Sequence, residues 1–271
     1  MPQTDLKNFE KIICERDGGW MTIWFNSPDN RNALSKQLTT EFMTALKTIK
    51  DDRTIRGVTL RGKGGVFCSG GDLKGFFSEQ SGGDPRPGFI KMNREAGDLF
   101  DLVMGLPQVV LAYVQGAAIA GGLGLMCCAD VIIVDEDAKF SLTETMIGIA
   151  PAQIAPIVVS RTGLPIARRI MLTGARFLGK DTPDYNLSDY VVDDEAGYDE
   201  ILLGLKKGIY KCAPGAVGMT KEILLATAHL DRDGQKDFAA EKFADAITSD
   251  EGREGIASFV QKRKPSWAED V

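Results

Sequence analysis

The sequence predicts an α/β fold with largely parallel strands, followed by a region made almost entirely of helices. Two observations predict it. Strand-like and helix-like stretches alternate up to about residue 134, which is typical of a parallel sheet with helical connections. From Gln153 onward the pattern is almost entirely helical. The chain has 271 residues, of which 44% are hydrophobic, so we expect one large globular domain with a smaller appendage.

The first elements are a hairpin and a helix. Residues 9–15 and 20–25 are predicted strands around the turn Asp17-Gly18-Gly19. Ser35 can cap a helix over residues 36–50, because the apolar residues of this segment fall on one face. These apolar residues are Leu38, Phe42, Ala45, Leu46 and Ile49.

The rest of the core follows the same alternation. A strand at 58–60 precedes residues 78–88, where Gly, Pro and Ser predict a mobile surface loop. The next elements are a helix at 91–104, a strand at 109–114, a glycine-led helix at 121–128 and a strand at 131–134. The helices expected after them are 153–162, 165–173, 197–211, 216–228, 234–247 and 251–262. We place the division between the core, 1–203, and the C-terminal helical region, 204–271, near Leu203 to Pro214.

The composition argues against several classes of protein. The net charge of −6 argues against general binding to nucleic acid.

The cysteines form no CxxC pair and no disulfide framework, and the N-terminus carries charges where a secretory signal needs an apolar core, so a cytoplasmic protein is expected. The uncharged stretch between Asp101 and Asp130 is divided by Pro107 and several glycines, so it predicts buried core and not a membrane span. The five cysteines are Cys14, Cys68, Cys127, Cys128 and Cys212.

Two glycine pairs are the first candidates for a functional site. In residues 67–74 a strand runs into Gly70-Gly71, where the backbone can approach a ligand and leave N–H groups free to donate. A simple tight turn would use the same residues. In residues 115–124 the pair Gly121-Gly122 opens an apolar helix, whose first amides have no internal partner. Close packing of the helix on a strand would also select these small residues.

A carboxylate in an apolar run is the third candidate. Glu144 lies in residues 140–151, which are mostly apolar. Such surroundings raise the pKa of a carboxyl toward the range of a general acid or base. A solvated turn residue or a helix-capping partner is the alternative. His229 is the only histidine, so neither a metal site nor a Ser-His-Asp set is predicted.

Together these motifs resemble the enoyl-CoA hydratase/isomerase, or crotonase, family in their order and approximate spacing. The resemblance runs from about Phe9 to Trp267. It also includes residues 30–35, NRNALS, and the C-terminal runs 252–256, GREGI, and 259–265, FVQKRKP. It implies a spiral of β-β-α turns followed by C-terminal helices that build a homotrimer or homohexamer and close the acyl and CoA site.

The resemblance also implies roles for individual residues. The backbone N–H groups of Gly71 and Gly121 would form an oxyanion hole around the carbonyl oxygen of an acyl-CoA thioester, and Glu144 would be the catalytic acid/base. Coenzyme A enters as part of the substrate, so no separate cofactor and no metal are implied. The substrate-binding and CoA-binding positions are Arg31, Ala33, Leu34, Ser69, Gly71, Asp72, Leu73, Lys74, Gly122, Phe259 and Lys262, the last reaching from a neighbouring subunit.

One position departs from the family pattern. The best-known hydratases of the family carry a second glutamate where this chain has Gly124. A single glutamate can both orient a water and protonate Cα, which implies an enoyl-CoA hydratase. It can also shuttle one proton between carbons, which implies a Δ3-Δ2-enoyl-CoA isomerase. A non-catalytic acyl-CoA-binding protein is the alternative from another class.

A similarity to one branch of the family suggests the kind of acyl group that the substrate carries. Residues 150–156, APAQIAP, are similar to the branch of methylglutaconyl-CoA and isohexenylglutaconyl-CoA hydratases, which act in the breakdown of leucine and acyclic terpenes. Those substrates are branched and carry a second carboxylate, so a cation near the acyl end is implied, and Arg161 is a candidate. Residues 179–190, with Pro183, differ from many relatives and suggest a site edge of different shape.

Overall fold

The computed structural model describes residues 6, 8–72, 75 and 84–269. Among them, the main sheet has the strand order β1-β2-β3-β4-β6-β9. Its strands are β1 (Ile12–Asp17), β2 (Trp20–Phe25), β3 (Gly57–Gly62), β4 (Val109–Val114), β6 (Val131–Asp135) and β9 (Tyr190–Val192). β1 and β2 form an antiparallel hairpin, and every other neighbouring pair is parallel. The predicted hairpin and the largely parallel sheet are therefore confirmed.

A smaller sheet continues from the first. It consists of β5 (Ala117–Ile119), β7 (Lys139–Ser141) and β8 (Arg176–Leu178), with β5 parallel to β7 and β8 antiparallel to it. None of these strands was predicted, and the expectation of an almost entirely helical chain after Gln153 is wrong for β8 and β9. Three residues are too few to show a periodicity of two, so these strands are defined by their neighbours in space.

Most predicted helices are present. The α-helices are α1 (Lys36–Ile49), α3 (Arg86–Met104), α4 (Gly121–Cys127), α5 (Ile154–Thr162), α6 (Leu164–Thr173), α7 (Glu195–Ile209), α8 (Pro214–Ala226), α9 (Arg232–Thr248) and α10 (Asp250–Val260). Short 3-10 helices are η1 (Pro28–Asn30), η2 (Lys63–Gly65), η3 (Glu144–Ile147) and η4 (Gly179–Tyr185). In α1, the Ser35 side chain accepts a hydrogen bond from Leu38 N at 3.3 Å, and all five predicted apolar residues are buried.

The start of α3 corrects one prediction. Residues 86–88 form its first turn, where prolines are tolerated because the first N–H groups of a helix have no internal partner. The expected loop at 78–88 is therefore wrong in its last three residues. The rest of that loop up to residue 83 lies outside the described residues.

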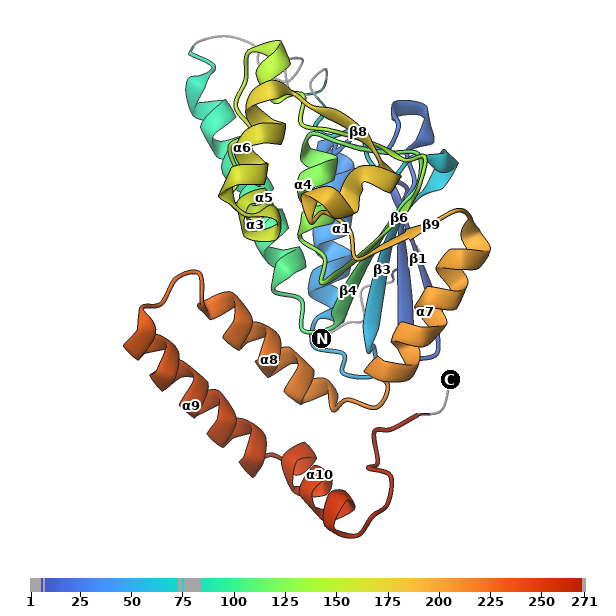
Figure 1. The fold of residues 1–271 in the computed structure, drawn as a ribbon, viewed down its shortest axis with the longest axis vertical. Coiled ribbons are helices and arrows are strands. Elements are labelled where there is room, and N and C mark those ends of the chain that lie inside the picture. Colours follow the sequence, from blue (N-terminus) through green and yellow to red (C-terminus); the bar gives the residue numbers. More distant parts are fainter. Residues whose placement is uncertain (1–5, 7, 73–74, 76–83, 270–271) are drawn as a thin grey trace.

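The helices divide between the two faces of the main sheet (Figure 1). One face packs against α1, α3, α4 and α5 and holds the larger hydrophobic core. The other face packs against α7 through a smaller cluster that includes Trp20, Leu111, Tyr113 and Tyr198. Because α7 spans residues 195–209 and lies on the sheet, the predicted division at 203/204 falls inside this helix.

A buried guanidinium fastens α7 to the sheet. Arg61 on β3 binds both carboxylate oxygens of Glu195 at 2.6 and 2.7 Å. Its guanidinium also lies over the rings of Trp24, Tyr113 and Tyr198 at 4.2, 4.7 and 4.9 Å. Planar stacking on aromatic rings and two-point carboxylate binding are specific to arginine, so this position joins the helix to the sheet in one register.

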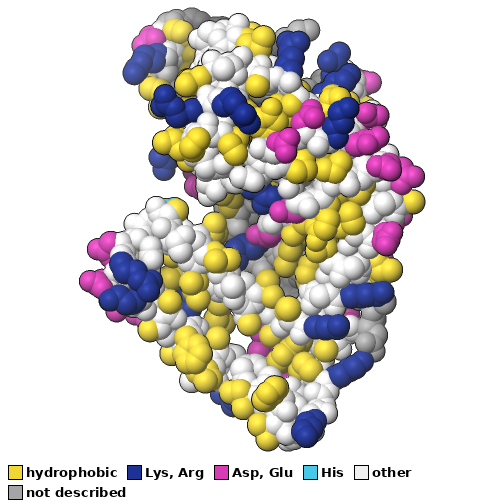
Figure 2. Space-filling model, in the orientation of Figure 1, with side chains coloured by type: hydrophobic (Ala, Val, Ile, Leu, Met, Phe, Trp, Pro, Cys, Tyr) yellow, Lys and Arg dark blue, Asp and Glu magenta, His cyan; other side chains and the backbone are white. Residues whose placement is uncertain are grey.

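Helices α8, α9 and α10 form an arm beside the core (Figure 1). Large apolar side chains are exposed along it, and Figure 2 shows hydrophobic side chains gathered over this part of the surface. They include Leu224, Phe243, Ile256, Phe259 and Val260. An exposed apolar surface of this extent is typical of a protein interface.

Lys221 joins the arm to the core. Its ammonium binds the Asp130 carboxylate at 2.5 Å and the Gln108 carbonyl at 2.6 Å. Asp130 also accepts a hydrogen bond from Val110 N at 2.7 Å, at the start of β4. Burial outweighs the attraction of Asp130 and lowers the pKa of the Lys221 ammonium. The first helix of the arm is therefore tied to the sheet by a buried charge.

We expect Lys221→Met to lower the free energy of unfolding by about 1–3 kcal/mol, because a charged hydrogen bond to the core is lost. Urea denaturation measures this loss. The amides of α8 should exchange faster with solvent in the variant than in the wild type, whereas the amides of the sheet should change less. Lys236→Met is the matched control, since the Lys236 pair with Asp233 is exposed at 57% and 86%. Equal stability of the two variants would contradict the anchoring role.

Candidate active site

Three consecutive parallel segments bring the predicted site residues to one edge of the smaller sheet. Cys68 forms a parallel bridge with Ala118 in β5, and β5 is parallel to β7. Gly71, Gly121 and Glu144 each follow one of these segments by two or three residues. Because the carboxyl ends of parallel strands lie at the same edge, the three residues share that edge. They are 50 and 23 residues apart in sequence (121 − 71 and 144 − 121), so only the tertiary structure brings them together.

The amides of Gly71 and Gly121 are adjacent. A Cβ built on Gly121 would lie 3.7 Å from Gly71 N, and one built on Gly70 would lie 3.4 Å from Gly121 N. Within the described part of the chain, neither N–H donates a hydrogen bond to another group. Two adjacent, unpaired backbone donors are suited to a carbonyl oxygen that becomes negative during a reaction.

The backbone just before Gly121 is strained. Ala120 has φ 52° and ψ −124°, a conformation that residues with a side chain rarely adopt. Its N–H donates to Ser141 O at 2.9 Å, which ties this turn to the end of β7. Such strain costs about 1–3 kcal/mol and is concentrated at functional sites. The sequence analysis did not identify Ala120, because alanine carries no signal for a positive φ.

Glu144 is the buried carboxylate of this edge. It begins η3, is 8% exposed, and has one oxygen, Oε2, that is buried and has no hydrogen-bond partner among the described residues. Removal from water raises the pKa of its carboxyl. The side chain of the next residue, Thr145, donates to Met171 O at 3.1 Å and so fixes η3 on α6. The expected burial of this carboxyl is confirmed, and the alternative of a solvated turn residue is wrong.

Packing explains why this chain has Gly124 where the best-known hydratases of the family have a second glutamate. A Cβ on Gly124 would lie 2.1 Å from Ile154 Cγ2, at the start of α5. The helices α4 and α5 therefore approach so closely that position 124 has no space for any side chain. A glutamate at this position would require α5 to move, so the site is built around Glu144 without a carboxylate at 124.

The residues assigned to coenzyme A by resemblance lie partly beside the amides. Leu34 N donates to Gly70 O at 2.8 Å, and the Leu34 side chain would be 3.5 Å from a Cβ on Gly121. Ser69 N donates to the Arg31 carbonyl at 3.1 Å, so residues 31–34 and 69–71 run side by side. Ala33 and Leu34 are each 8% exposed, whereas the Arg31 side chain is exposed. Asp72 accepts a hydrogen bond from Gly75 N at 3.1 Å. Leu73 and Lys74 lie outside the described residues.

Of the other predicted site residues, Gly122 lies at the same edge, and Phe259, Lys262 and Arg161 do not. Gly122 packs against the segment before Gly70, because a Cβ there would lie 2.4 Å from Cys68 O. Phe259 lies in the last turn of α10, on the arm, and Lys262 follows the end of this helix. Figure 1 shows that end of the molecule far from α6, on which η3 packs. One chain alone therefore does not bring Phe259 or Lys262 to Glu144. Arg161 binds Asp189 at 2.6 Å, so this guanidinium already has a carboxylate partner.

Two residues of the motifs support the site, although the sequence analysis gave them no role of their own. Asn32 is fully buried, accepts a hydrogen bond from Ser27 N at 2.8 Å, and donates to the carbonyls of Lys63 and Val66 at 2.9 and 2.6 Å. Cys68 is buried under the glycine pair, and burial raises the pKa of its thiol to about 12, so a thiolate nucleophile is not available there.

The comparisons with known proteins agree with this geometry. A family model described as "Enoyl-CoA hydratase/isomerase" matches residues 15–270. The chain belongs to the enoyl-CoA hydratase/isomerase family. It is therefore an enzyme with the crotonase fold that the sequence predicted.

Relatives cover nearly the whole chain. A putative enoyl-CoA hydratase of Thermus thermophilus is 30% identical over 94% of this chain and 100% of that protein. The solved structure of an enoyl-CoA hydratase/isomerase from Marinobacter aquaeolei is 40% identical, with a TM-score of 0.89, over 96% of this chain and 99% of that chain. Pseudomonas aeruginosa AtuE is also 40% identical, with a TM-score of 0.91, over 96% and 100% of the two chains.

Other kinds of site were also sought in the described residues. They contain no group of three or more His, Cys, Asp or Glu that could hold a metal ion. They also contain no helix with the length and apolar character that crossing a membrane requires. His229 is exposed in the turn after α8, and its backbone N–H donates to Ala226 O.

The two neighbouring glycines of α4 should respond differently to alanine. Gly122→Ala should destabilise the enzyme by about 1–3 kcal/mol, because the new methyl meets the Cys68 carbonyl. Gly121→Ala should leave the free energy of unfolding unchanged or slightly higher, because its nearest neighbour would be at 3.5 Å and alanine favours helices. Its methyl would nevertheless lie beside Gly71 N, so we expect kcat to fall about 10²–10³-fold. Denaturation curves and steady-state rates of both variants check this, and a fully active Gly121→Ala variant would contradict it.

Proposed function

We propose that this protein is an enoyl-CoA hydratase that adds water across the double bond of an α,β-unsaturated acyl-CoA. The observation that carries the proposal is the buried carboxylate oxygen of Glu144, which has no hydrogen-bond partner among the described residues, at the sheet edge that holds the amides of Gly71 and Gly121. Glu144 is the acid/base, and the N–H groups of Gly71 and Gly121 are the oxyanion donors. Acyl-CoA thioesters are the substrates, and coenzyme A enters only as their carrier.

The chemistry needs one proton acceptor and one place for negative charge. The Glu144 carboxylate takes a proton from a water molecule while the oxygen of that water bonds to Cβ of the acyl group. The electrons of the double bond then move toward the thioester oxygen, where the two amides stabilise the enolate. The carboxylic acid of Glu144 next returns a proton to Cα, and the thioester carbonyl forms again. A raised pKa suits both steps, because the same group must be a base and then an acid.

An enoyl-CoA isomerase is the second candidate, and the packing at Gly124 favours it. The Ile154 side chain occupies the space in which a side chain at position 124 would lie, so no second carboxylate is present there. Glu144 alone would then move a proton from one carbon to another, and no water would be needed. Incubation of separate 2-enoyl and 3-enoyl thioesters, with product identification by mass spectrometry and chromatography, distinguishes the two. A hydroxyacyl product from the 2-enoyl ester supports hydration, and double-bond migration without gain of water would reject it.

The exposed arm supports a proposal about assembly. We propose that copies of the chain associate through α8, α9 and α10 into a homotrimer or homohexamer, which would bury the apolar side chains of the arm. In such an assembly, Phe259 and Lys262 would complete the substrate site of a neighbouring copy.

Glu144→Gln should lower turnover about 10²–10⁴-fold, because an amide can neither take nor give the proton. Binding of a saturated acyl-CoA should stay near the wild-type value, since the amide donors and the fold are unchanged. Stopped assays of hydration and calorimetric binding of butyryl-CoA make the two measurements. Full activity of the variant would show that Glu144 is not the acid/base.

The same variant should be more stable than the wild type at neutral pH. Burial raises the pKa of Glu144 in the folded state, so folding disfavours the ionised carboxylate. The folded protein therefore binds the proton more tightly than the unfolded chain, and wild-type stability falls as pH rises from the ordinary glutamate pKa through the raised one. We expect the thermal midpoint of Glu144→Gln to exceed that of the wild type above this window and to equal it below. A constant difference at all pH values would contradict the assignment.

A further inference from the structure

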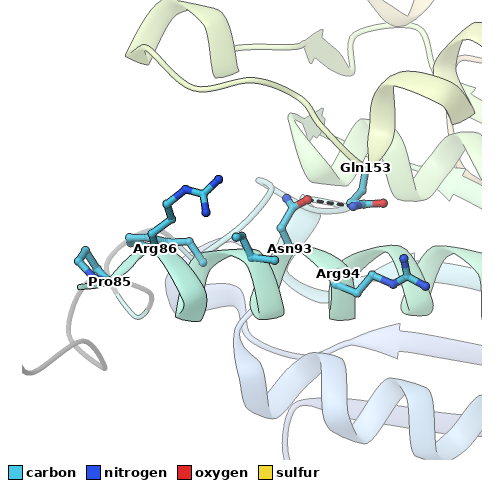
Figure 3. A pocket seen from close by; sticks show the side chains of 7 residues that line it. Pro85, Arg86, Asn93, Arg94 and Gln153 are labelled. Atoms are coloured by element: carbon cyan, nitrogen blue, oxygen red, sulfur yellow. Dashed lines mark hydrogen bonds between the residues drawn. The ribbon is translucent and has the colours of Figure 1, made fainter. Parts of the chain in front are cut away.

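Polar side chains join the helices that cover the main sheet. Figure 3 shows one such contact: Asn93 of α3 and Gln153, just before α5, point toward each other and are hydrogen bonded at 3.0 Å. The arm lies beside the core, and Lys221 fastens its first helix there. Figure 1 also shows the chain running back from the end of α10 toward α7. This return segment, residues 265–269, connects the end of the arm to the core.

A buried guanidinium binds the chain on both sides of the arm. Arg56, whose side chain is 4% exposed, donates to the carbonyls of Ile209 and Cys212, where the chain leaves α7; the bond to Ile209 O is 3.3 Å long. It also donates to the carbonyl of Trp267, in the return segment, at 3.0 Å. Trp267 follows Cys212 by 55 residues (267 − 212). One side chain therefore closes the whole arm into a loop.

Arg56 is itself part of the hydrogen bonding of the main sheet. Its N–H donates to Gly19 O at 2.7 Å, just before β2, and its carbonyl accepts from Val109 N at 3.2 Å, at the start of β4. Its guanidinium lies 5.4 Å from the centre of the Tyr210 ring. A charged donor that is removed from water is costly to leave without acceptors, so the carbonyls that Arg56 binds are held firmly. The return segment thus has a fixed point of attachment on the sheet.

Trp267 lies between the core and the last helix of the arm. Its ring packs on α10, since a Cβ on Gly255 would lie 3.0 Å from Trp267 Cη2. The indole Nε1–H donates to Lys211 O at 3.2 Å, just after α7. Glu254, the neighbour of Gly255, accepts a hydrogen bond from Ser266 N at 2.9 Å. The return segment therefore contacts α10 on one side and the core on the other.

Two contacts together set the direction of α10. In its first turn, Glu251 accepts hydrogen bonds from Gly215 N, at the start of α8, at 2.9 and 3.1 Å. About one turn further along, Gly255 meets the Trp267 ring. Phe259, which is 84% exposed, and Lys262 lie beyond this second contact. Without Trp267, α10 would be held at its first turn, and the far end of the helix would be free to move.

We infer that Trp267, held on the core by Arg56, is a positioning residue that places Phe259 and Lys262 for the substrate site of a neighbouring copy. The inference rests on the proposed function and assembly, in which those two residues complete that site. It adds that their contribution depends on a contact made inside the chain that supplies them. Closing the arm into a loop restricts the conformations that its last helix can take.

Trp267→Ala tests the inference in the full-length protein, because it removes the ring from Gly255 and leaves every proposed catalytic group in place. Amide hydrogen exchange should become faster in α10 and stay at the wild-type rate in the main sheet. Butyryl-CoA should bind about tenfold or more weakly in calorimetry, as for the loss of a hydrogen bond to a charged group. The KM for an enoyl-CoA should rise by a similar factor with kcat near the wild-type value, since Glu144 and the two amides lie in the core.

Three further variants separate positioning from a general loss of stability. Gly255→Leu should displace the Trp267 ring and weaken binding in the same way, although leucine favours the helix. Trp267→Phe keeps an aromatic ring on Gly255 and should recover most of the affinity. Glu269→Gln is the control, because Glu269 is 60% exposed and its carboxylate lies 3.9 Å from the Arg56 guanidinium. It should behave as the wild type.

Several outcomes would overturn the inference. They are wild-type exchange in α10 of Trp267→Ala, wild-type affinity of this variant for butyryl-CoA, and an equal loss of affinity in Glu269→Gln. Faster exchange throughout the main sheet would also overturn it, since that result indicates general destabilisation. A wild-type protein that sediments as a monomer would overturn it as well, because no neighbouring copy would receive Phe259 and Lys262.

Failure of the inference differs from failure of the proposed hydration. If the wild type binds butyryl-CoA but hydrates no enoyl-CoA, the hydration fails, and the affinities of the variants still decide the inference. If the wild type hydrates enoyl-CoA and Trp267→Ala equals it in KM and in affinity, the inference fails and the hydration stands.

Discussion

The site depends on how closely two backbones approach each other at its edge. Hydrogen bonds between residues 68 and 117–119 hold the first glycine segment beside β5, with lengths of 3.0 and 3.1 Å. At this separation a Cβ on Gly122 would lie 2.4 Å from Cys68 O, and one on Gly116 would lie 1.9 Å from Gly65 O. The glycines are required because the chains are so close, and the proximity is what makes the amides of Gly71 and Gly121 neighbours.

Two unfavourable features, one of backbone conformation and one electrostatic, lie at the same edge of the smaller sheet. Ala120 takes a rare backbone conformation, and Glu144 keeps a buried oxygen without a partner among the described residues. Each feature disfavours folding by itself, because strain and desolvation of a charge both cost free energy. Both are tolerated because the sheet on one side and α4, α5 and α6 on the other are well packed. Local instability at a catalytic site supported by a stable surround is common in enzymes.

The two faces of the main sheet pack against different helices. The face toward α1, α3, α4 and α5 carries the larger core. The face toward α7 is fastened by the buried guanidinium of Arg61 and the stacked rings of Tyr113 and Tyr198, 4.0 Å apart. Lys221 then ties the arm to the same core. The enzyme thus fixes the catalytic edge and the arm to one sheet.

The sequence by itself determined the parallel α/β class, the hairpin, the helices from α1 to α10 that are long enough to show a period, and the family. These follow from local signals, since capping residues, glycine turns and apolar spacing act within a few residues of one another. It also identified Glu144 and both glycine pairs as candidates. The tertiary structure alone decided that Gly71 and Gly121 are adjacent, that Ile154 excludes a side chain at 124, and that Arg161 is occupied by Asp189. It also defined β5, β7, β8 and β9, because a three-residue strand is stabilised by the neighbours with which it pairs, and those neighbours are distant in sequence.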